Sequence, residues 1–166
     1  MLEILKYPDP RLKRISEPVV EFGPQLHRLL DAMATTMYAA DGIGLAAPQV
    51  GETLRAFVID LGTSENKKNK LFEFINPEIT EAEGKIAFEE GCLSVPGVSE
   101  EVSRNEQIRV KFKDRFGKSQ EMQAEGLLAV AIQHENDHLN GVLFVEKLSP
   151  LKRRLVKKKL QKAVTL

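Results

Sequence analysis

Residues 127–139 constrain the fold more than any other part of the chain. The first six of them, Leu-Leu-Ala-Val-Ala-Ile, are apolar and would give a helix no polar face. A helix that is apolar all round lies in the protein interior. Asn140-Gly141 supplies a stop signal after it. The other elements of the chain must therefore enclose this helix.

The chain before this segment predicts one helix and two strands. Five apolar residues recur at helical spacing between residues 24 and 40, and Pro24 suits the first turn. These five are Leu26, Leu29, Leu30, Met33 and Met37. Residues 55–60 have the apolar centre of a buried strand. Residues 71–75 form a second candidate strand, which we expect to stop at Asn76-Pro77.

The remaining segments predict a loop, a hairpin and a final helix. The polar stretch 62–70 is expected to be a solvated loop. Residues 110–112 alternate as in a half-buried strand, and the Asp-first, Gly-last turn at 114–117 favours a hairpin with residues 119–124. A helix from 150 to about 164 has three leucines on one side, Leu151, Leu155 and Leu160.

Together these elements predict an α+β fold. We expect mostly antiparallel sheets packed around a buried central helix, with an additional helix at the C-terminus. The length of 166 residues fits one domain.

Charge is distributed unevenly along the chain. The formal net charge is zero, so no global field favours binding to DNA. Residues 148–166 carry seven basic side chains and no acidic one, which leaves residues 1–147 with 17 basic against 24 acidic side chains. The C-terminal helix is therefore expected to be basic and the rest of the protein acidic.

The sequence also indicates the cellular compartment. Cys92 is the single cysteine, so no disulfide can form within the chain, and a cytoplasmic location is the default. The N-terminus lacks a charged region followed by a sustained apolar run, and no stretch of about 18 apolar residues occurs. We therefore expect neither a secretion signal nor a membrane span.

The central helix carries a pattern typical of metallohydrolases, His-Glu-x-x-His. His134 and His138 are four residues apart, so both imidazoles project from one face and can hold a single cation. In this pattern the glutamate, here Glu135, does not bind the metal but acts as general base beside the bound water.

Two histidines leave the metal short of a third protein ligand. Downstream of His138 the only carboxylate is Glu146, and the only other histidine, His27, lies far upstream. Cys92 is the best candidate, because its neighbours Gly91 and Pro96 indicate a bend rather than a regular strand. The residues therefore favour a metal site of Cys92, His134 and His138.

Other interpretations of these residues exist. A lone cysteine is more often an inert buried side chain. The histidines and glutamate can also form an incidental polar face on a packed helix. A thiol hydrolase, with Cys92 as nucleophile and His134 or His138 as base, is a further alternative, but it leaves the spacing of the histidines and Glu135 unexplained.

Three segments, taken in order, resemble the signature motifs of the bacterial type of peptide deformylase. They are Gly42-Ile43-Gly44-Leu45-Ala46-Ala47-Pro48-Gln49, Glu90-Gly91-Cys92-Leu93-Ser94 and Gln133-His134-Glu135-Asn136-Asp137-His138. The resemblance extends over nearly the whole chain. It implies a metal-dependent amidase that removes the formyl group from N-formylmethionyl nascent peptides and releases formate.

The resemblance also implies a role for particular residues. A bound cation lowers the pKa of water from about 16 toward 7 and polarises the formyl oxygen. Glu135 would take the water proton and pass it to the leaving amine. By family position, the Gln49 amide and the Leu93 backbone N–H would donate to the formyl oxygen. Glu90 would pair with Arg104 and hold the cysteine loop.

The substrate pocket is inferred from residue type. Gly42 and Gly44, on either side of Ile43, have no side chains and would let a peptide backbone approach closely. The apolar residues Leu127, Val130 and Ala131 could line the methionine pocket. A protein that binds peptide N-termini without catalysis is an alternative from another functional class, and the intact Glu135 argues against it.

The resemblance implies one divalent metal ion. It favours Fe(II), with zinc the main rival and nickel or cobalt also compatible with two imidazoles and a thiolate. We interpret residues 1–149 as the catalytic part of the domain and residues 150–166 as a basic helix appended to it. Such a helix is often only a solvated surface, but it could also bind the RNA of the ribosome.

Overall fold

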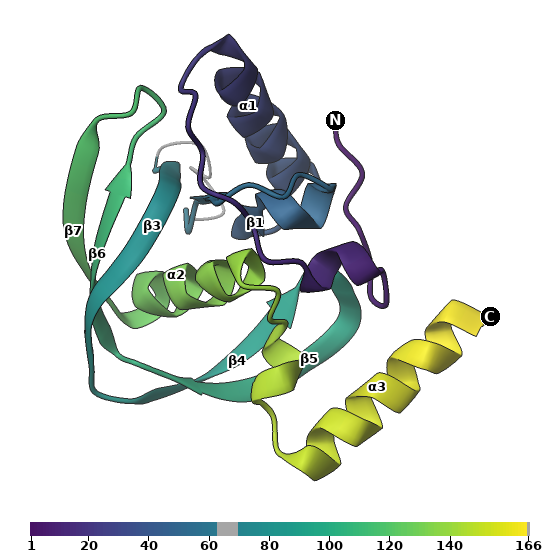
Figure 1. The fold of residues 1–166 in the computed structure, drawn as a ribbon. Helices are drawn as coiled ribbons and strands as arrows, with labels where there is room; N and C mark the ends of the chain where they lie inside the picture. Colours follow the sequence, from purple (N-terminus) through teal and green to yellow (C-terminus); the bar gives the residue numbers. More distant parts are fainter. Residues whose placement is uncertain (63–69, 166) are drawn as a thin grey trace.

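The computed structural model describes residues 1–62 and 70–165, which form two antiparallel sheets and three α-helices (Figure 1). One sheet has the strand order β1-β2-β3-β6-β7, and the other is the hairpin β4-β5. The strands are β1 (Gly44–Ala46), β2 (Ala56–Ile59), β3 (Phe72–Glu83), β4 (Ile86–Cys92), β5 (Val95–Arg104), β6 (Gln107–Lys113) and β7 (Ser119–Glu125). The α-helices are α1 (Pro24–Ala39), α2 (Gly126–Leu139) and α3 (Pro150–Thr165), and the short 3-10 helices are η1 (Pro10–Lys13), η2 (Ala47–Val50) and η3 (Phe144–Lys147). The expected α+β class is confirmed.

Helix α2 lies between the five-stranded sheet and the β4-β5 hairpin (Figure 1). Ala129 and Ile132 of α2 are fully buried and belong to one apolar cluster with Phe57 and Phe74 of the sheet. The predicted buried helix is therefore present at the centre of the fold. Gly141 follows its end at a φ of 75°, and a Cβ there would collide with the backbone carbonyl of Lys13. The positive φ and the close contact with Lys13 both require glycine at the end of this helix.

Helix α1 and the β6-β7 hairpin also agree with the sequence patterns. Pro24 stands in the first turn of α1. In the hairpin turn, the Asp114 carboxylate accepts hydrogen bonds from the backbone N–H groups of Phe116 and Lys118, at 2.9 and 3.0 Å. The aspartate at the first position of the turn therefore fixes the turn through its own side chain.

The expected strand end at Asn76-Pro77 is wrong. Strand β3 continues to Glu83, and its register with β6 shifts between Ile75 and Glu78. Asn76 has a φ of 51°, and its side chain bonds both the N–H and the C=O of Val19, at 2.8 and 2.9 Å. The two residues thus form a bulge, which accommodates a proline without ending the strand. Most of the expected 62–70 loop lies outside the described residues.

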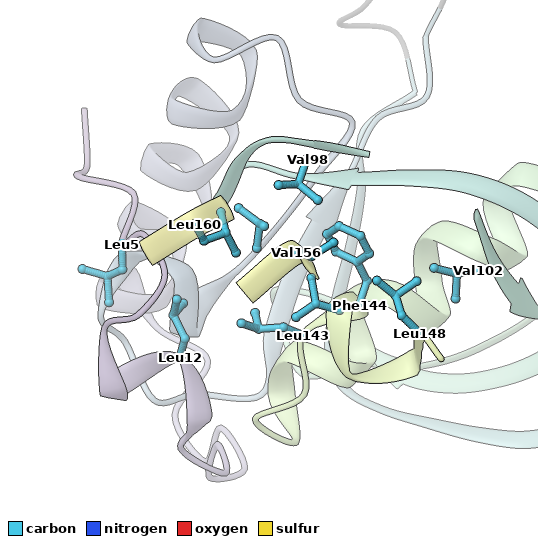
Figure 2. Close-up of a cluster of buried hydrophobic side chains, with 11 residues drawn as sticks. Leu5, Leu12, Val98, Val102, Leu143, Phe144, Leu148, Val156 and Leu160 are labelled. Carbon is cyan, nitrogen blue, oxygen red and sulfur yellow. The ribbon is translucent and has the colours of Figure 1, made fainter. Parts of the chain in front are cut away.

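Helix α3 packs on the protein through Leu160, as expected, but not through the other two expected leucines. Leu151 and Leu155 are 64% and 58% exposed, whereas Val156 and Leu160 are buried. Figure 2 shows Val156 and Leu160 in a cluster with Leu5 near the N-terminus and with Val98 of β5. The apolar face was misjudged because Val156 was omitted from it. Among the described residues, no helix is both long and apolar enough to cross a membrane.

Candidate metal centre

Helix α2 and strand β4 bring three potential metal ligands together. His134 and His138 lie one helical turn apart with their ring centroids 5.1 Å from each other, and both are buried. Cys92 is the last residue of β4, where the pairing with β5 shifts register just before the turn, and its Sγ lies 3.3 Å from His138 Nε2. The ligand atoms of all three residues lie within 4.8 Å of one another.

These donors fit a divalent transition metal. Sulfur and nitrogen atoms bound to one tetrahedral ion lie about 3.6 Å apart, given bond lengths of about 2.3 and 2.1 Å. The observed Sγ to Nε2 distance of 3.3 Å is close to this value. Two imidazoles and one thiolate leave one position open, as in catalytic rather than structural sites.

Glu135 lies beside this centre in a buried position. Within the described part of the chain, its Oε1 has no hydrogen-bond partner, so a further group in the site, such as water, is needed to satisfy it. Burial raises the pKa of Glu135 to about 7, against the opposing effect of His134. A carboxyl group with this pKa can both accept and release a proton near neutral pH.

The histidines differ in their electrostatic surroundings. Burial holds the pKa of His138 well below its usual value, which favours the neutral imidazole that a metal ligand requires. Burial also opposes charge on His134, but hydrogen bonds with Cys92 and Glu90 raise its pKa well above the usual value. To bind a metal, His134 must release the proton on Nε2, so protonation and metal binding compete at this residue.

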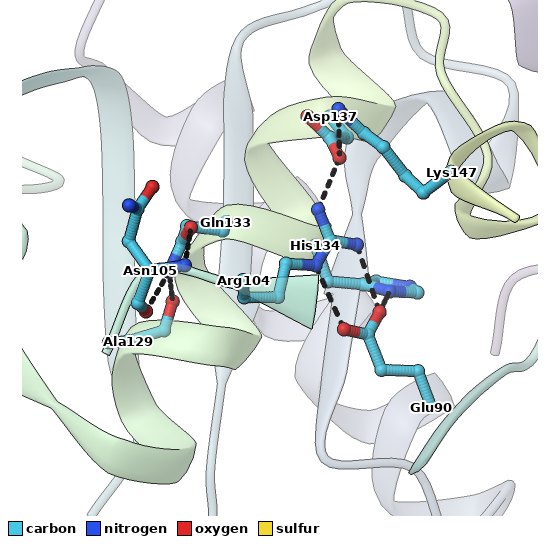
Figure 3. Close-up of polar contacts among 8 residues, drawn as sticks. All are labelled: Glu90, Arg104, Asn105, Ala129, Gln133, His134, Asp137 and Lys147. Carbon is cyan, nitrogen blue, oxygen red and sulfur yellow. Dashed lines mark hydrogen bonds and ion pairs between the residues drawn. The ribbon is translucent and has the colours of Figure 1, made fainter. Parts of the chain in front are cut away.

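A network of charged side chains holds His134 through its Nδ1 (Figure 3). His134 Nδ1 lies 2.8 Å from Glu90 Oε1, and Arg104 donates through Nε to Glu90 Oε2 at 2.8 Å. Burial works against the charge of Glu90, yet the hydrogen bonds of Arg104 and His134 lower its pKa to about 2. Glu90 thereby fixes the imidazole plane and leaves Nε2 for the metal.

Two members of this network were missed in the sequence. Arg104 also donates to Asp137 Oδ2 at 2.6 Å, and Lys147 Nζ lies 3.7 Å from the same oxygen. Asp137 stands three residues after His134 on the same helix, and this spacing was the available signal. Lys147 had no comparable signal, because η3 places it.

The two residues expected to donate to the formyl oxygen both lie next to Cys92. Gln49, in η2, is 1% exposed, and its Nε2 lies 3.5 Å from Cys92 Sγ. Leu93 directly follows Cys92 in the turn to β5. The glycines of the first motif make room for Glu135 and Leu93: a Cβ at Gly44 would lie 2.5 Å from Glu135 Oε2, and one at Gly42 would lie 2.6 Å from Leu93 Cδ1. This adds a reason for glycine that the sequence did not reveal.

A cavity of about 670 Å³ opens onto the centre. The expected pocket residues all contribute to its lining, namely Gly42, Ile43, Gly44, Leu127, Val130 and Ala131. Five consecutive residues of β4, from Phe88 to Cys92, also line the cavity. Strand β1 is at the edge of the large sheet, and β4 pairs with β5 alone in the two-stranded sheet. The cavity therefore runs between two strand edges.

Comparisons with known proteins show the family to which this chain is related. Residues 1–154 match the family model for polypeptide deformylase. A peptide deformylase from Wolinella succinogenes is 49% identical over 164 residues, which cover 98% of this chain and 96% of the relative. One from Thermodesulfovibrio yellowstonii is 52% identical over 159 residues, 96% of each chain.

Solved structures give the same result. The crystal structure of a peptide deformylase from Legionella pneumophila matches with a TM-score of 0.93 and 49% identity, over 99% of this chain and 96% of that one. The structure of the enzyme from Synechococcus elongatus in complex with actinonin matches with a TM-score of 0.90 and 42% identity, over 95% and 86% of the two chains.

Proposed function

Because the chain belongs to the peptide deformylase family of enzymes, we propose that it removes the formyl group from the N-terminal formylmethionine of newly synthesised polypeptides and releases formate. The observation that carries this proposal is that three metal donors, a buried glutamate and an amide donor lie together beside a cavity. This set of groups matches what amide hydrolysis requires.

Cys92, His134 and His138 would hold the metal. When bound, the metal supplies Lewis acidity, which activates water near neutral pH and polarises the formyl carbonyl. Glu135 accepts a proton from the attacking water as its oxygen bonds to the formyl carbon. The carbon–nitrogen bond then breaks, and Glu135 returns the proton to the leaving amine nitrogen. The products are formate and a free N-terminal methionine.

Gln49 and Leu93 would stabilise the formyl oxygen as it gains charge. Gln49 Nε2 lies 3.5 Å from Cys92 Sγ, and Leu93 is the residue that follows Cys92. Removing a donor of this kind costs about 10²–10³ in kcat in other hydrolases. We expect Gln49→Leu to retain metal and to lose turnover by a factor in this range, whereas an unchanged kcat would remove Gln49 from the oxyanion site.

The cavity offers a binding mode for the peptide. Leu127, Val130 and Ala131 provide an apolar wall for the methionine side chain. The backbone that follows would lie between the edges of β1 and β4 and add a strand to them. Main-chain hydrogen bonds of this kind depend little on side chains, so they suit an enzyme that acts on many different sequences.

A direct assay tests the proposal. Formate release from a formyl-Met peptide should be abolished by chelation and restored by Fe(II) or Zn(II). Glu135→Ala should retain the metal and lose the rate. Turnover that is indifferent to the chelator, with an acyl adduct trapped on Cys92, would favour the thiol hydrolase instead. Peptide binding without formate release would favour a non-catalytic binder.

We propose Fe(II) as the metal in the cell, with zinc as the main rival and nickel or cobalt as possible substitutes. A thiolate-bound ferrous site is sensitive to oxygen, so aerobic purification can exchange the metal. Metal analysis of anaerobically purified protein, compared with activity, decides between these ions. We also propose a cytoplasmic location, where nascent chains are made.

Helix α3 is the proposed contact with the ribosome. Lys152, Arg154 and Lys158 are exposed on it, and its buried residues face the domain. We treat residues 150–166 as an appended helix in function, although Val156 and Leu160 pack into the rest of the domain. Deleting the helix would remove that packing, so replacing the three basic residues with glutamate is the better test. Weaker ribosome binding with unchanged hydrolysis of short formyl peptides is expected, and equal ribosome affinity would rule the contact out.

A further inference from the structure

Ser94 belongs to the second sequence motif but has no part in the reaction described above. Its side chain is fully buried in the turn between β4 and β5. Buried hydroxyl groups are normally hydrogen-bonded, and Ser94 Oγ accepts a hydrogen bond from Gln49 Nε2 at 3.1 Å. Its partner is therefore the side chain proposed to bind the formyl oxygen.

The Gln49 amide is held at both of its ends. The Ala46 backbone N–H donates to Oε1 at 2.9 Å, which identifies the other end as the nitrogen. Nε2 carries two hydrogens: one is directed at Ser94 Oγ, and the other at Cys92 Sγ, 3.5 Å away. Because Ser94 occupies the first hydrogen, the second is directed at the metal ligands, where the formyl carbonyl would lie.

The N-terminal segment holds the backbone around Ser94. The Tyr7 N–H donates to Ser94 O at 2.8 Å, and Lys6 Nζ donates to Leu93 O at 2.9 Å. The Leu5 N–H donates to Gln49 O at 2.7 Å. Residues 5–7 therefore tie together the loops that carry Gln49 and Leu93. The Ser94 hydroxyl has a fixed place relative to both.

We infer that Ser94 is a positioning residue that aims the Gln49 amide at the formyl oxygen, an inference that rests on the proposed function. Without Oγ, the first Nε2 hydrogen loses its acceptor and the amide can turn away from the reacting carbonyl. The hydrogen bond from Gln49 to the formyl oxygen stabilises charge that develops in the transition state. Weakening it therefore lowers kcat rather than raising KM.

A double-mutant cycle tests this inference. Ser94→Ala should lower kcat about tenfold, the size of one neutral hydrogen bond, with KM changed by less than about twofold. Metal content and thermal midpoint should stay close to those of the wild type. Ser94→Thr, which keeps the acceptor, should retain most of the rate. In a Gln49→Leu background, Ser94→Ala should have no further effect, because the two residues act as one unit.

Ser103→Ala is the matched control, since Ser103 is an exposed serine on β5. It should change neither kcat nor KM. The inference is overturned if Ser94→Ala leaves kcat unchanged, if its effect multiplies with that of Gln49→Leu, or if the loss of rate follows a loss of metal. A wild-type protein that releases no formate would instead overturn the proposed function, and this inference with it.

Discussion

Replacing Arg104 with methionine removes a guanidinium that two acidic side chains share. Arg104 is 4% exposed and bonds Glu90, which is 5% exposed, and Asp137, which is 19% exposed. Methionine fills much of the same volume but carries no charge. Glu90 is then left as a buried carboxylate whose remaining partner is His134.

The cost of this change follows from the burial of the pair. Removing one partner of a buried ion pair costs about 3–5 kcal/mol, because the other charge stays desolvated and uncompensated. A domain of this size unfolds with about 5–15 kcal/mol. With about 2–4 °C per kcal/mol, the thermal midpoint should fall by about 6–20 °C. Metal affinity should fall about 10–100-fold as well, because Glu90 no longer fixes His134.

Urea unfolding of the chelated protein measures the first effect without a contribution from the metal. Arg109→Met is the matched control, because Arg109 pairs with Glu81 and Glu121 on the surface and is 39% exposed. Its loss should cost less than about 1 kcal/mol. If Arg104→Met costs no more than Arg109→Met, the buried network does not stabilise the fold and the reasoning from burial is refuted.

Three further predictions concern the site, the C-terminal helix and a surface turn. Gly44→Ala should reduce formate release at least tenfold, because the new Cβ would displace Glu135. Circular dichroism should show little change in secondary structure. Full activity would show that the carboxylate adapts. Leu160→Ala should cost about 2–5 kcal/mol of unfolding free energy, and Leu155→Ala, at 58% exposure, less than about 0.5; equal costs would show that the helix is not packed as described. Backbone hydrogen bonds from Lys118 and Phe116 lower the pKa of Asp114 below its usual 3.8, so its stabilising effect is complete above that pH and is lost as the pH falls. Asp114→Ala should therefore destabilise the protein more at pH 7 than in acid, and a destabilisation that does not shrink as the pH falls would contradict this reasoning.

Much of the centre was accessible from the sequence because its chemistry is local. His134, Glu135 and His138 lie on one helical turn, so spacing alone places them together. Cys92 followed from counting possible ligands. The apolar run before His134 predicted a buried helix, and the fold confirms it. In these cases the residue type and a single periodicity carry the information.

What the sequence missed depends on long-range packing. Asn76-Pro77 carries a strong stop signal, but the bonds of Asn76 to Val19 convert it into a bulge within β3. The buried face of α3 is decided by the cluster it meets, and that cluster includes Leu5 from the other end of the chain. Ser94 resembles any turn serine until Gln49 is brought against it. No local sequence pattern predicts these long-range contacts.

The hydrogen bonds of residues 5–7 also affect when the metal site can form during synthesis of the chain. Lys6 and Leu93 are 87 positions apart, and the histidines follow more than 40 residues after Leu93. During synthesis the chain leaves the ribosome from its N-terminus, so residues 5–7 emerge long before any of their partners. Closing such long loops is slow and precedes the gain from the contacts that it permits. Each new molecule can therefore bind its metal through all three ligands only after synthesis has passed His138.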